Sequence, residues 1–302
     1  MKVRLIINGK KAGLQPVRDA VYQIRDQGCD LEVRSTWEAG DVLRLVQEAR
    51  QQGVDRIIAG GGDGTVNEAV DALMTLPKDE RCELAILPLG TANDFATSLG
   101  QALDPLGALQ LAYSGASEAI DIGKINKRHF VNIATAGFGA KVTAQTPIAL
   151  KNFLGGGAYT LQGLIQALDF VPYTGTLKMA GKERRTEVVV GGVCNGRQAG
   201  GGQVLAPQAY INDGLLDVVG VVQFPAVELS NVVRALLDPN IESNFVFREQ
   251  VPSLEFESHG EIMPINLDGE PYAPRKAQIE LIRAAVRLVV PENCPLIATA
   301  AS

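Results

Sequence analysis

The segment Gly60–Thr65 reads GGGDGT and lies between a short apolar run, Arg56–Ala59, and a stretch in which apolar residues recur at helical spacing. Glycines let a chain turn tightly and bring bare backbone N–H groups against an anion, and the helix that follows adds the positive end of its dipole. The pattern therefore predicts a phosphate-binding turn between a strand and a helix. A Gly-rich turn also occurs where a chain only has to change direction, so this segment alone leaves both interpretations open.

A second segment, Pro88–Ala96, reads PLGTANDFA and also follows an apolar run, Leu84–Leu87. If both runs are strands of one parallel sheet, the two polar segments lie side by side at its carboxyl edge. With both segments intact, the chain resembles the diacylglycerol kinase catalytic family, whose hallmarks are a GGDGT loop and a P-x-G-T-x-N-D-[FL]-A segment. The resemblance covers nearly the whole chain. Asn195–Gly202 and Ile211–Leu216 are similar to segments of the bacterial YegS-type lipid kinases in particular.

Composition bounds the class of protein. A chain of 302 residues with 46% hydrophobic and 21% charged residues is long enough for two ordinary hydrophobic cores. Its net charge of −6, without a cluster of Lys and Arg between aromatics, argues against nucleic-acid binding. No apolar stretch approaches the roughly 20 residues of a membrane span, and the apolar run near Met1 is too short for a signal peptide, so a cytoplasmic protein is expected. The cysteines lack metal-site spacing and are expected to be free, buried thiols.

Strand and helix patterns alternate through the first part of the chain. Strands are predicted at Val3–Asn8 and Leu31–Thr36, and helices at Pro16–Gln27 and Asp41–Gln52, with Asp41 as a helix cap. Together with the two apolar runs above, this alternation predicts an α/β domain over residues 1–126, built on a doubly wound parallel sheet.

After Asp121 the pattern changes to β-rich runs separated by glycine. The runs are Phe130–Ala134, Thr186–Val193, Leu215–Gln223, Ser253–Glu257, Ile262–Asp268 and Gln278–Ile282. They predict a second, mostly antiparallel domain over residues 127–302, interrupted by helices at Tyr159–Phe170 and Pro225–Leu237. The family resemblance implies a β-sandwich here, of the NAD kinase and diacylglycerol kinase type, and a return of the last segment, Leu288–Pro295, to the first domain.

Phosphoryl transfer requires bound nucleotide phosphates, cations and a base. The chain lacks a Walker motif, so GGGDGT has to hold the phosphates through backbone N–H groups and the Thr65 hydroxyl, with Asn67 and Glu68 in the first helical turn. The resemblance adds Thr36 and Thr91 as ATP contacts. The complete predicted nucleotide set is Thr36, Gly60, Gly61, Gly62, Asp63, Gly64, Thr65, Val66, Asn67, Glu68 and Thr91.

Three aspartates have both structural and functional interpretations. Asp63 could bond its own turn, but its place inside the phosphate loop favours function. Asp94 could cap a helix that starts at Phe95 or take part in catalysis, with equal support for each. Asp121 could orient water or metal, or make a structural hydrogen bond. The aromatic residues, Trp37 included, are dispersed, and we expect them to pack in the interior and not to form a base-stacking platform.

Asn266–Glu270 reads NLDGE, an Asp-Gly turn that projects Glu270. The sequence alone favours an exposed carboxylate after a hairpin. The family resemblance implies that this glutamate is the catalytic proton acceptor, with Asp268 as the competing candidate. Asp213 likewise heads an Asp-Gly turn. The resemblance implies that its carboxylate and the carbonyls of Tyr210 and Leu215 bind Mg²⁺ or Ca²⁺, a set of oxygen ligands that suits either ion. A separate Mg²⁺ is expected to arrive with ATP.

The resemblance implies an ATP-dependent kinase that phosphorylates a lipid hydroxyl in phospholipid biosynthesis and meets its lipid at the membrane surface. An NAD kinase is the alternative enzyme, because it shares the GGDG loop and the two-domain plan, whereas PLGTANDFA belongs to the lipid-kinase branch. A non-catalytic nucleotide-binding module is the third alternative. The intact Asp63, Asp94, Asp213 and Glu270 argue against it.

Overall fold

The computed structural model describes residues 1–137 and 171–299, which form two compact units. The first unit contains Met1–Ile122, the short segment Ile211–Asp213 and the chain from Ile282 onward. The second unit contains the described parts of Gly123–Tyr210 together with Gly214–Leu281. The predicted helix Tyr159–Phe170 lies outside the described residues.

The first unit is built on a parallel sheet with the strand order β4-β3-β1-β2. Its strands are β1 (Lys2–Asn8), β2 (Asp30–Thr36), β3 (Arg56–Gly61) and β4 (Glu83–Pro88). The end of β17 (Lys276–Val289) adds a further parallel strand beside β4, where Leu288 faces Leu84. The chain runs outward from β1 to β2 and then returns to β3 on the other side of β1. The predicted doubly wound parallel sheet is therefore confirmed.

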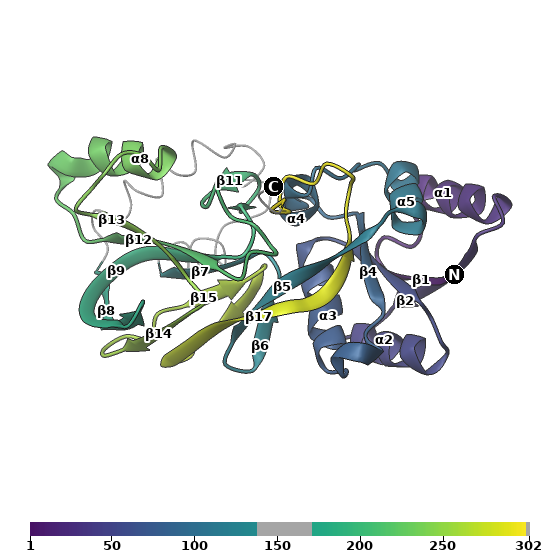
Figure 1. The fold of residues 1–302 in the computed structure, drawn as a ribbon, viewed down its shortest axis with the longest axis horizontal. Coiled ribbons are helices and arrows are strands. Elements are labelled where there is room, and N and C mark those ends of the chain that lie inside the picture. The colour runs from purple at the N-terminus through teal and green to yellow at the C-terminus, as the bar shows by residue number, and fades with distance from the viewer. Residues whose placement is uncertain (138–170, 300–302) are drawn as a thin grey trace. The chain divides into compact units, whose positions relative to one another are not determined.

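Helices cover both faces of this sheet (Figure 1). Helices α1 (Gln15–Asp26) and α5 (Pro105–Ser114) pack together on one face, and α2 (Asp41–Gln51) and α3 (Asp63–Met74) pack together on the other. The first unit also contains two shorter helices, η1 (Lys78–Glu80) after α3 and α4 (Asp94–Ser98), which begins within PLGTANDFA. Among the described residues, no helix has both the length and the hydropathy that a membrane span requires.

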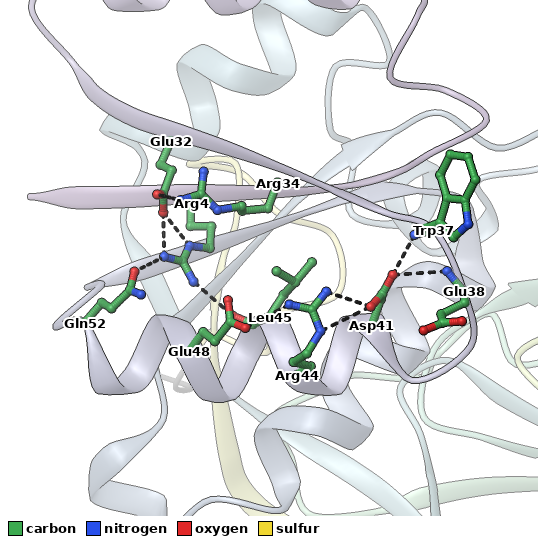
Figure 2. Close-up of polar contacts among 10 residues, drawn as sticks. All are labelled: Arg4, Glu32, Arg34, Trp37, Glu38, Asp41, Arg44, Leu45, Glu48 and Gln52. Atoms are coloured by element: carbon green, nitrogen blue, oxygen red, sulfur yellow. Dashed lines mark hydrogen bonds and ion pairs between the residues drawn. The ribbon is translucent and has the colours of Figure 1, made fainter.

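Arg4 brings a charge into the middle of β1, where its side chain is fully buried. Its guanidinium donates to the Glu32 carboxylate at 2.6 Å, to the carbonyl oxygen of Leu45 at 3.2 Å and to the Gln52 side chain (Figure 2). A buried charge is tolerated when it is paired and hydrogen-bonded in this way. The contacts of Arg4 thereby join β1, β2 and α2.

Asp41 is not the helix cap that the sequence predicted. The capping position belongs to Gly40, with φ +89°, and Asp41 is the first residue of α2. The Asp41 carboxylate instead accepts hydrogen bonds from the backbone N–H groups of Trp37 at 2.6 Å and Glu38 at 3.0 Å (Figure 2). Its hydrogen bonds with Arg44, and then those from Trp37 and Glu38, lower the pKa of Asp41 to about 2. This charged carboxylate fixes the loop between β2 and α2.

The second unit is antiparallel, as predicted. Its strands follow the order β16-β15-β7-β9-β8-β14-β17, with β12 on β9, β13 on β12 and β6 on β5. These strands are β5 (Ser117–Ile125), β6 (Arg128–Phe130), β7 (Ile133–Gly137), β8 (Tyr173–Met179), β9 (Lys182–Cys194), β12 (Leu216–Val222), β13 (Val246–Val251), β14 (Ser253–Ser258), β15 (Ile265–Leu267) and β16 (Glu270–Tyr272), with a separate small ribbon of β10 (Gln198–Ala199) and β11 (Gln203–Val204). Phe130, Leu216 and Leu267 have no exposed surface and lie at the centre of the core of this unit.

Several predicted elements differ in extent from those observed. The predicted strand Phe130–Ala134 is interrupted between β6 and β7, because the backbone N–H groups of Val131 and Asn132 bind a carboxylate instead of a neighbouring strand. The predicted helix Pro225–Leu237 begins as a 3₁₀ turn, η2 (Ala226–Glu228), and continues as α8 (Leu229–Leu237). The cysteines form no disulfide among the described residues, as expected, and only Cys82 and Cys194 are buried.

Candidate functional site

The two glycine-containing loops meet at the carboxyl edge of the parallel sheet. Gly61, at the end of β3, faces Pro88, at the end of β4, and the Leu89 N–H donates to the Gly61 carbonyl at 2.7 Å. A Cβ atom added to Gly90 would lie only 2.6 Å from the Cα of Gly62. The loops therefore touch backbone to backbone, which only glycine at this position permits. The prediction that GGGDGT and PLGTANDFA lie side by side is confirmed.

Helix α3 begins within the glycine loop, at Asp63. The N–H groups of Thr65 and Val66 donate to the Gly62 carbonyl at 2.9 and 3.1 Å. The first N–H groups of any α-helix, here those of Asp63 and Gly64, have no acceptor within the helix and are suited to bind an anion. The predicted strand, loop and helix are all present, and the loop contains the start of α3.

The side chains of α3 divide between interior and surface. Val66 and Asn67 are buried, with exposed fractions of 2% and 3%, whereas Glu68 is exposed. Because α3 begins at Asp63, Asn67 and Glu68 lie in its second turn and not in the first turn as predicted. Thr65 is half-buried and lies over Gly61, where an added Cβ would meet the Thr65 hydroxyl oxygen at 2.2 Å. Residues 62–65 are thus partly exposed, whereas Gly60 and Gly61 before them and Val66 and Asn67 after them are buried.

Asp63 joins the two loops through its side chain. Its carboxylate accepts hydrogen bonds from the backbone N–H groups of Asp94 at 3.2 Å and Phe95 at 3.1 Å, the first two residues of α4. Asp63 therefore caps a helix 31 residues away in sequence. Asp94 is the first residue of α4 and not its cap, since the capping position is held by Asn93. The Asn93 amide instead exchanges hydrogen bonds with the backbone of Gly90 at 2.8 and 3.1 Å.

The remaining predicted nucleotide residues lie along the same edge. Thr36 ends β2, and its hydroxyl accepts a hydrogen bond from the Gly9 N–H at 3.3 Å. Thr91 follows Gly90 and is exposed. With the strand order β4-β3-β1-β2, the residues run from Thr91 through GGGDGT and Gly9 to Thr36. The sequence places Gly9 and Gly90 at this edge but not among the nucleotide contacts, and the close approaches that require glycine at both positions have no sequence signature.

Asp121 has a structural role in the first unit. It is buried, with 3% of its surface exposed, and its carboxylate accepts the N–H of Ala284 at 2.7 Å. Ala284 has a φ of +48°, an unusual conformation for a residue other than glycine. The Asp121 N–H also donates to the Ile211 carbonyl at 2.6 Å. These contacts support the structural alternative for Asp121.

Glu270 lies at the start of β16, directly after a tight hairpin turn. Leu267 faces Glu270 across the turn, and Asp268 and Gly269 have φ values of +48° and +106°. Positive φ at both central residues is typical of the type I′ hairpin turn that Asp-Gly favours. The Asn266 side chain accepts the Gly269 N–H at 2.8 Å and tightens the turn. The predicted hairpin is confirmed, and the Glu270 carboxylate is exposed.

Asp268, the competing base, points into the protein. Its carboxylate accepts three backbone N–H groups, from Val131 at 2.7 Å, Ile133 at 2.8 Å and Asn132 at 3.2 Å. The residue is only 9% exposed. A carboxylate already bonded to three amides serves to position the hairpin, so Glu270 is the stronger base candidate of the two. No local pattern in the sequence predicts these contacts.

We expect Asp268→Ala to lower the free energy of unfolding by about 3 kcal/mol or more, because it leaves three backbone N–H groups without their acceptor in the interior. Chemical denaturation measures the change. Glu270→Ala, in the same hairpin but exposed, is the matched control and should change stability by about 0.5 kcal/mol or less. Equal stabilities of the two variants would contradict the positioning role of Asp268.

The predicted metal ligands lie in one short loop, residues 210–215. Gly214 has a φ of +79°, which turns the chain sharply between Asp213 and Leu215. Among the described residues there is no group of three or more His, Cys, Asp or Glu side chains with metal-binding geometry. The predicted metal ligands do not require such a group of side chains, because they are a single carboxylate and two main-chain carbonyls. These are hard oxygen ligands that fit Mg²⁺ or Ca²⁺.

A parallel sheet with a glycine-rich helix start at its carboxyl edge is typical of nucleotide-binding proteins of the doubly wound α/β class. Residues 2–125 match the family described as diacylglycerol kinase catalytic domain. Residues 132–290 match the YegS C-terminal NAD kinase beta sandwich-like domain. The chain belongs to the diacylglycerol kinase catalytic family, with a C-terminal domain of the YegS type.

Similar proteins cover nearly the whole chain. A protein of Shewanella frigidimarina named probable lipid kinase YegS-like is 46% identical over 294 residues, 97% of this chain and 95% of that protein. A protein of Chromohalobacter salexigens with the same name is 45% identical, over 97% of this chain and 94% of its own length. The crystal structure of a diacylglycerol kinase from Bacillus anthracis has a TM-score of 0.74 at 25% identity and covers 97% of this chain and 98% of its own.

Proposed function

We propose that this protein is an ATP-dependent lipid kinase that transfers the γ-phosphoryl group of ATP to a lipid hydroxyl. The observation that carries the proposal is the joined pair of loops, in which Asp63 of GGGDGT caps the helix of PLGTANDFA. The pairing supports a rigid phosphate site of the lipid-kinase branch. An NAD kinase would share the glycine loop. PLGTANDFA and the YegS-type C-terminal match favour a lipid over NAD as the phosphoryl acceptor.

The glycine loop, two threonines and Glu270 have distinct roles in the proposed transfer. The backbone N–H groups of Asp63 and Gly64, at the start of α3 within GGGDGT, hold the phosphates, and Thr36 and Thr91 contact the nucleotide. Glu270 accepts the proton of the lipid hydroxyl. At the same time the hydroxyl oxygen forms a bond to the γ-phosphorus, and the bond between the γ-phosphorus and the oxygen that leaves with ADP breaks. Mg²⁺ that arrives with ATP neutralises the charge that develops on the phosphates. The acceptor is an alcohol group on a lipid that the protein meets at the membrane surface, from the cytoplasm, in phospholipid biosynthesis.

The experiment that tests the function is incubation of the protein with ATP labelled at the γ-phosphate and an extracted phospholipid mixture. We expect label in the organic phase, in a product that mass spectrometry identifies as a phosphorylated lipid. Glu270→Gln protein is the control for contaminating kinases. Label transferred to NAD instead of lipid would favour the alternative enzyme, and ATP binding without any transfer would favour the non-catalytic module.

We further propose that the carboxylate of Asp213 and the carbonyls of Tyr210 and Leu215 bind a divalent ion. Asp213→Ala should then lose about 2 to 3 kcal/mol of stability at a metal concentration one hundredfold above Kd, because an ion that binds only the folded state stabilises it by mass action. Thermal unfolding with excess Mg²⁺ or Ca²⁺ and with EDTA measures the effect. Chelation should destabilise the wild type and Glu242→Ala, an exposed carboxylate control, but not Asp213→Ala. A wild type that melts identically under both conditions would refute the site.

A further inference from the structure

The loop after β2 carries an exposed aromatic side chain. Trp37 directly follows Thr36 and is 95% exposed, the largest fraction among the large hydrophobic side chains that the structure describes. It is the single tryptophan of the chain. The prediction that Trp37 packs in the interior is therefore wrong. An indole ring combines a large apolar face with a polar N–H, which makes an exposed tryptophan suited to contact a ligand.

The backbone that carries this ring is fixed in place. Asp41 accepts the N–H groups of Trp37 and Glu38 at 2.6 and 3.0 Å and pairs with Arg44 at 2.7 Å. Figure 2 shows the indole on the far side of its backbone from Asp41. With a pKa lowered to about 2, chiefly by Arg44, the Asp41 carboxylate stays charged at neutral pH. A ligand that contacts Trp37 thus meets a segment that is already ordered, which reduces the entropy lost on binding.

The position of Trp37 on the sheet edge fits the far end of a bound nucleotide. β1 lies between β3 and β2, with Ile7 facing Gly60 and Asn8 facing Thr36. Neighbouring strands are about 4.8 Å apart, which places Thr36 about 10 Å from Gly60. A nucleoside triphosphate whose phosphates lie on GGGDGT is longer than this distance. Its base therefore reaches the end of β2 if the nucleotide extends in that direction.

Two observations indicate that a nucleotide bound at GGGDGT extends towards β2. Towards β4, the backbone of Gly90 is in contact with Gly62, and the Asp63 carboxylate is bonded to the start of α4. Towards β2, the first residue beyond β1 is Gly9, which has no side chain to stand in the path. A Cβ on Gly9 would meet the Thr36 carbonyl oxygen at 2.2 Å, so the chain requires glycine there. On the β4 side the neighbouring loop is thus packed against GGGDGT, whereas the first residue beyond β1 on the β2 side has no side chain.

We propose that Trp37 is the base-stacking residue of the nucleotide site and that its indole ring lies against the face of the purine. The proposal rests on the proposed function, because it takes ATP as the ligand of GGGDGT. Stacking of a base on an aromatic side chain contributes about 5-fold to 100-fold in affinity, as measured by alanine substitution. In this proposal Thr36, at the end of β2, contacts the nucleotide beside Trp37, and Asp41 acts through the backbone of Trp37 as a positioning residue.

Titration calorimetry with ATP and with inorganic tripolyphosphate tests this assignment, since the second ligand has phosphates but no base. We expect Trp37→Ala to weaken ATP binding about 5-fold to 100-fold and to leave tripolyphosphate binding unchanged. Trp37→Phe should retain most of the ATP affinity, because it keeps an aromatic ring. Tyr22→Ala, which removes a 55% exposed aromatic ring from α1, is the matched control and should bind both ligands as the wild type does.

Intrinsic fluorescence supplies an independent readout, because Trp37 is the only tryptophan. ATP should change its emission, and tripolyphosphate should not. Unchanged ATP affinity in Trp37→Ala would overturn the stacking role and leave the nucleotide site intact, whereas a wild type that binds neither ligand would overturn the proposed function as well. Equal losses for both ligands would mean that the substitution disturbs the loop, and would refute stacking. If Trp37→Ala keeps its ATP affinity but no longer binds phospholipid vesicles that bind the wild type, the ring is a membrane contact.

Discussion

Glu270→Gln should lower turnover on the lipid substrate by about 10² to 10⁴, the range typical of a lost general base, and leave ATP affinity unchanged. The substitution keeps the shape of the side chain and removes its capacity to accept a proton. The hairpin should remain folded, because Glu270 is exposed and the turn is held by Asn266 and Asp268. Steady-state kinetics and calorimetric ATP binding together separate chemistry from binding.

The control for this prediction is Glu261→Gln, which changes another exposed glutamate of the second unit and should leave turnover unchanged. Turnover of Glu270→Gln close to the wild-type rate would eliminate Glu270 as the base. Asp268 would not replace it easily, because its carboxylate is bonded to three backbone N–H groups in the interior. A water molecule held near Asp94 would then be the next candidate.

Gly62→Asp should weaken ATP binding about 100-fold or more, since a carboxylate placed against the phosphates costs several kcal/mol in repulsion. The new Cβ would also lie 3.1 Å from the Cα of Gly90, so the two loops would have to separate slightly. Calorimetry with ATP and a thermal unfolding curve measure binding and folding independently. A folded Gly62→Asp protein with wild-type ATP affinity would show that GGGDGT is not the phosphate loop.

Two alanine variants separate the effect of the added charge in Gly62→Asp from the effect of the added side-chain carbon. Gly62→Ala adds the Cβ without the charge and should lose much less affinity than Gly62→Asp. Gly13→Ala is the control for glycine replacement itself, because a Cβ at Gly13 meets nothing within 4 Å and its φ is not positive. Similar losses in Gly62→Ala and Gly62→Asp would assign the effect to loop packing instead of electrostatic repulsion.

The local sequence determines much of the fold and of the candidate site. Alternating apolar strands and amphipathic helices predict the parallel sheet, since each pattern follows from the side-chain period of one element. GGGDGT and NLDGE predict a helix-start loop and a hairpin turn, because glycine and aspartate tolerate backbone angles that other residues avoid. Each of these inferences depends on residues within one segment of the chain.

Only the tertiary structure decided how polar residues in distant segments are used. Asp63 caps a helix 31 residues away, and Asp268 binds backbone N–H groups 135 to 137 residues away. Arg4 is buried because α2 and β2 supply its acceptors, whereas Trp37 is exposed although its large apolar ring favours the interior. Burial and hydrogen-bond partners depend on which surfaces meet after folding. The spacing of residues along one segment therefore does not predict them.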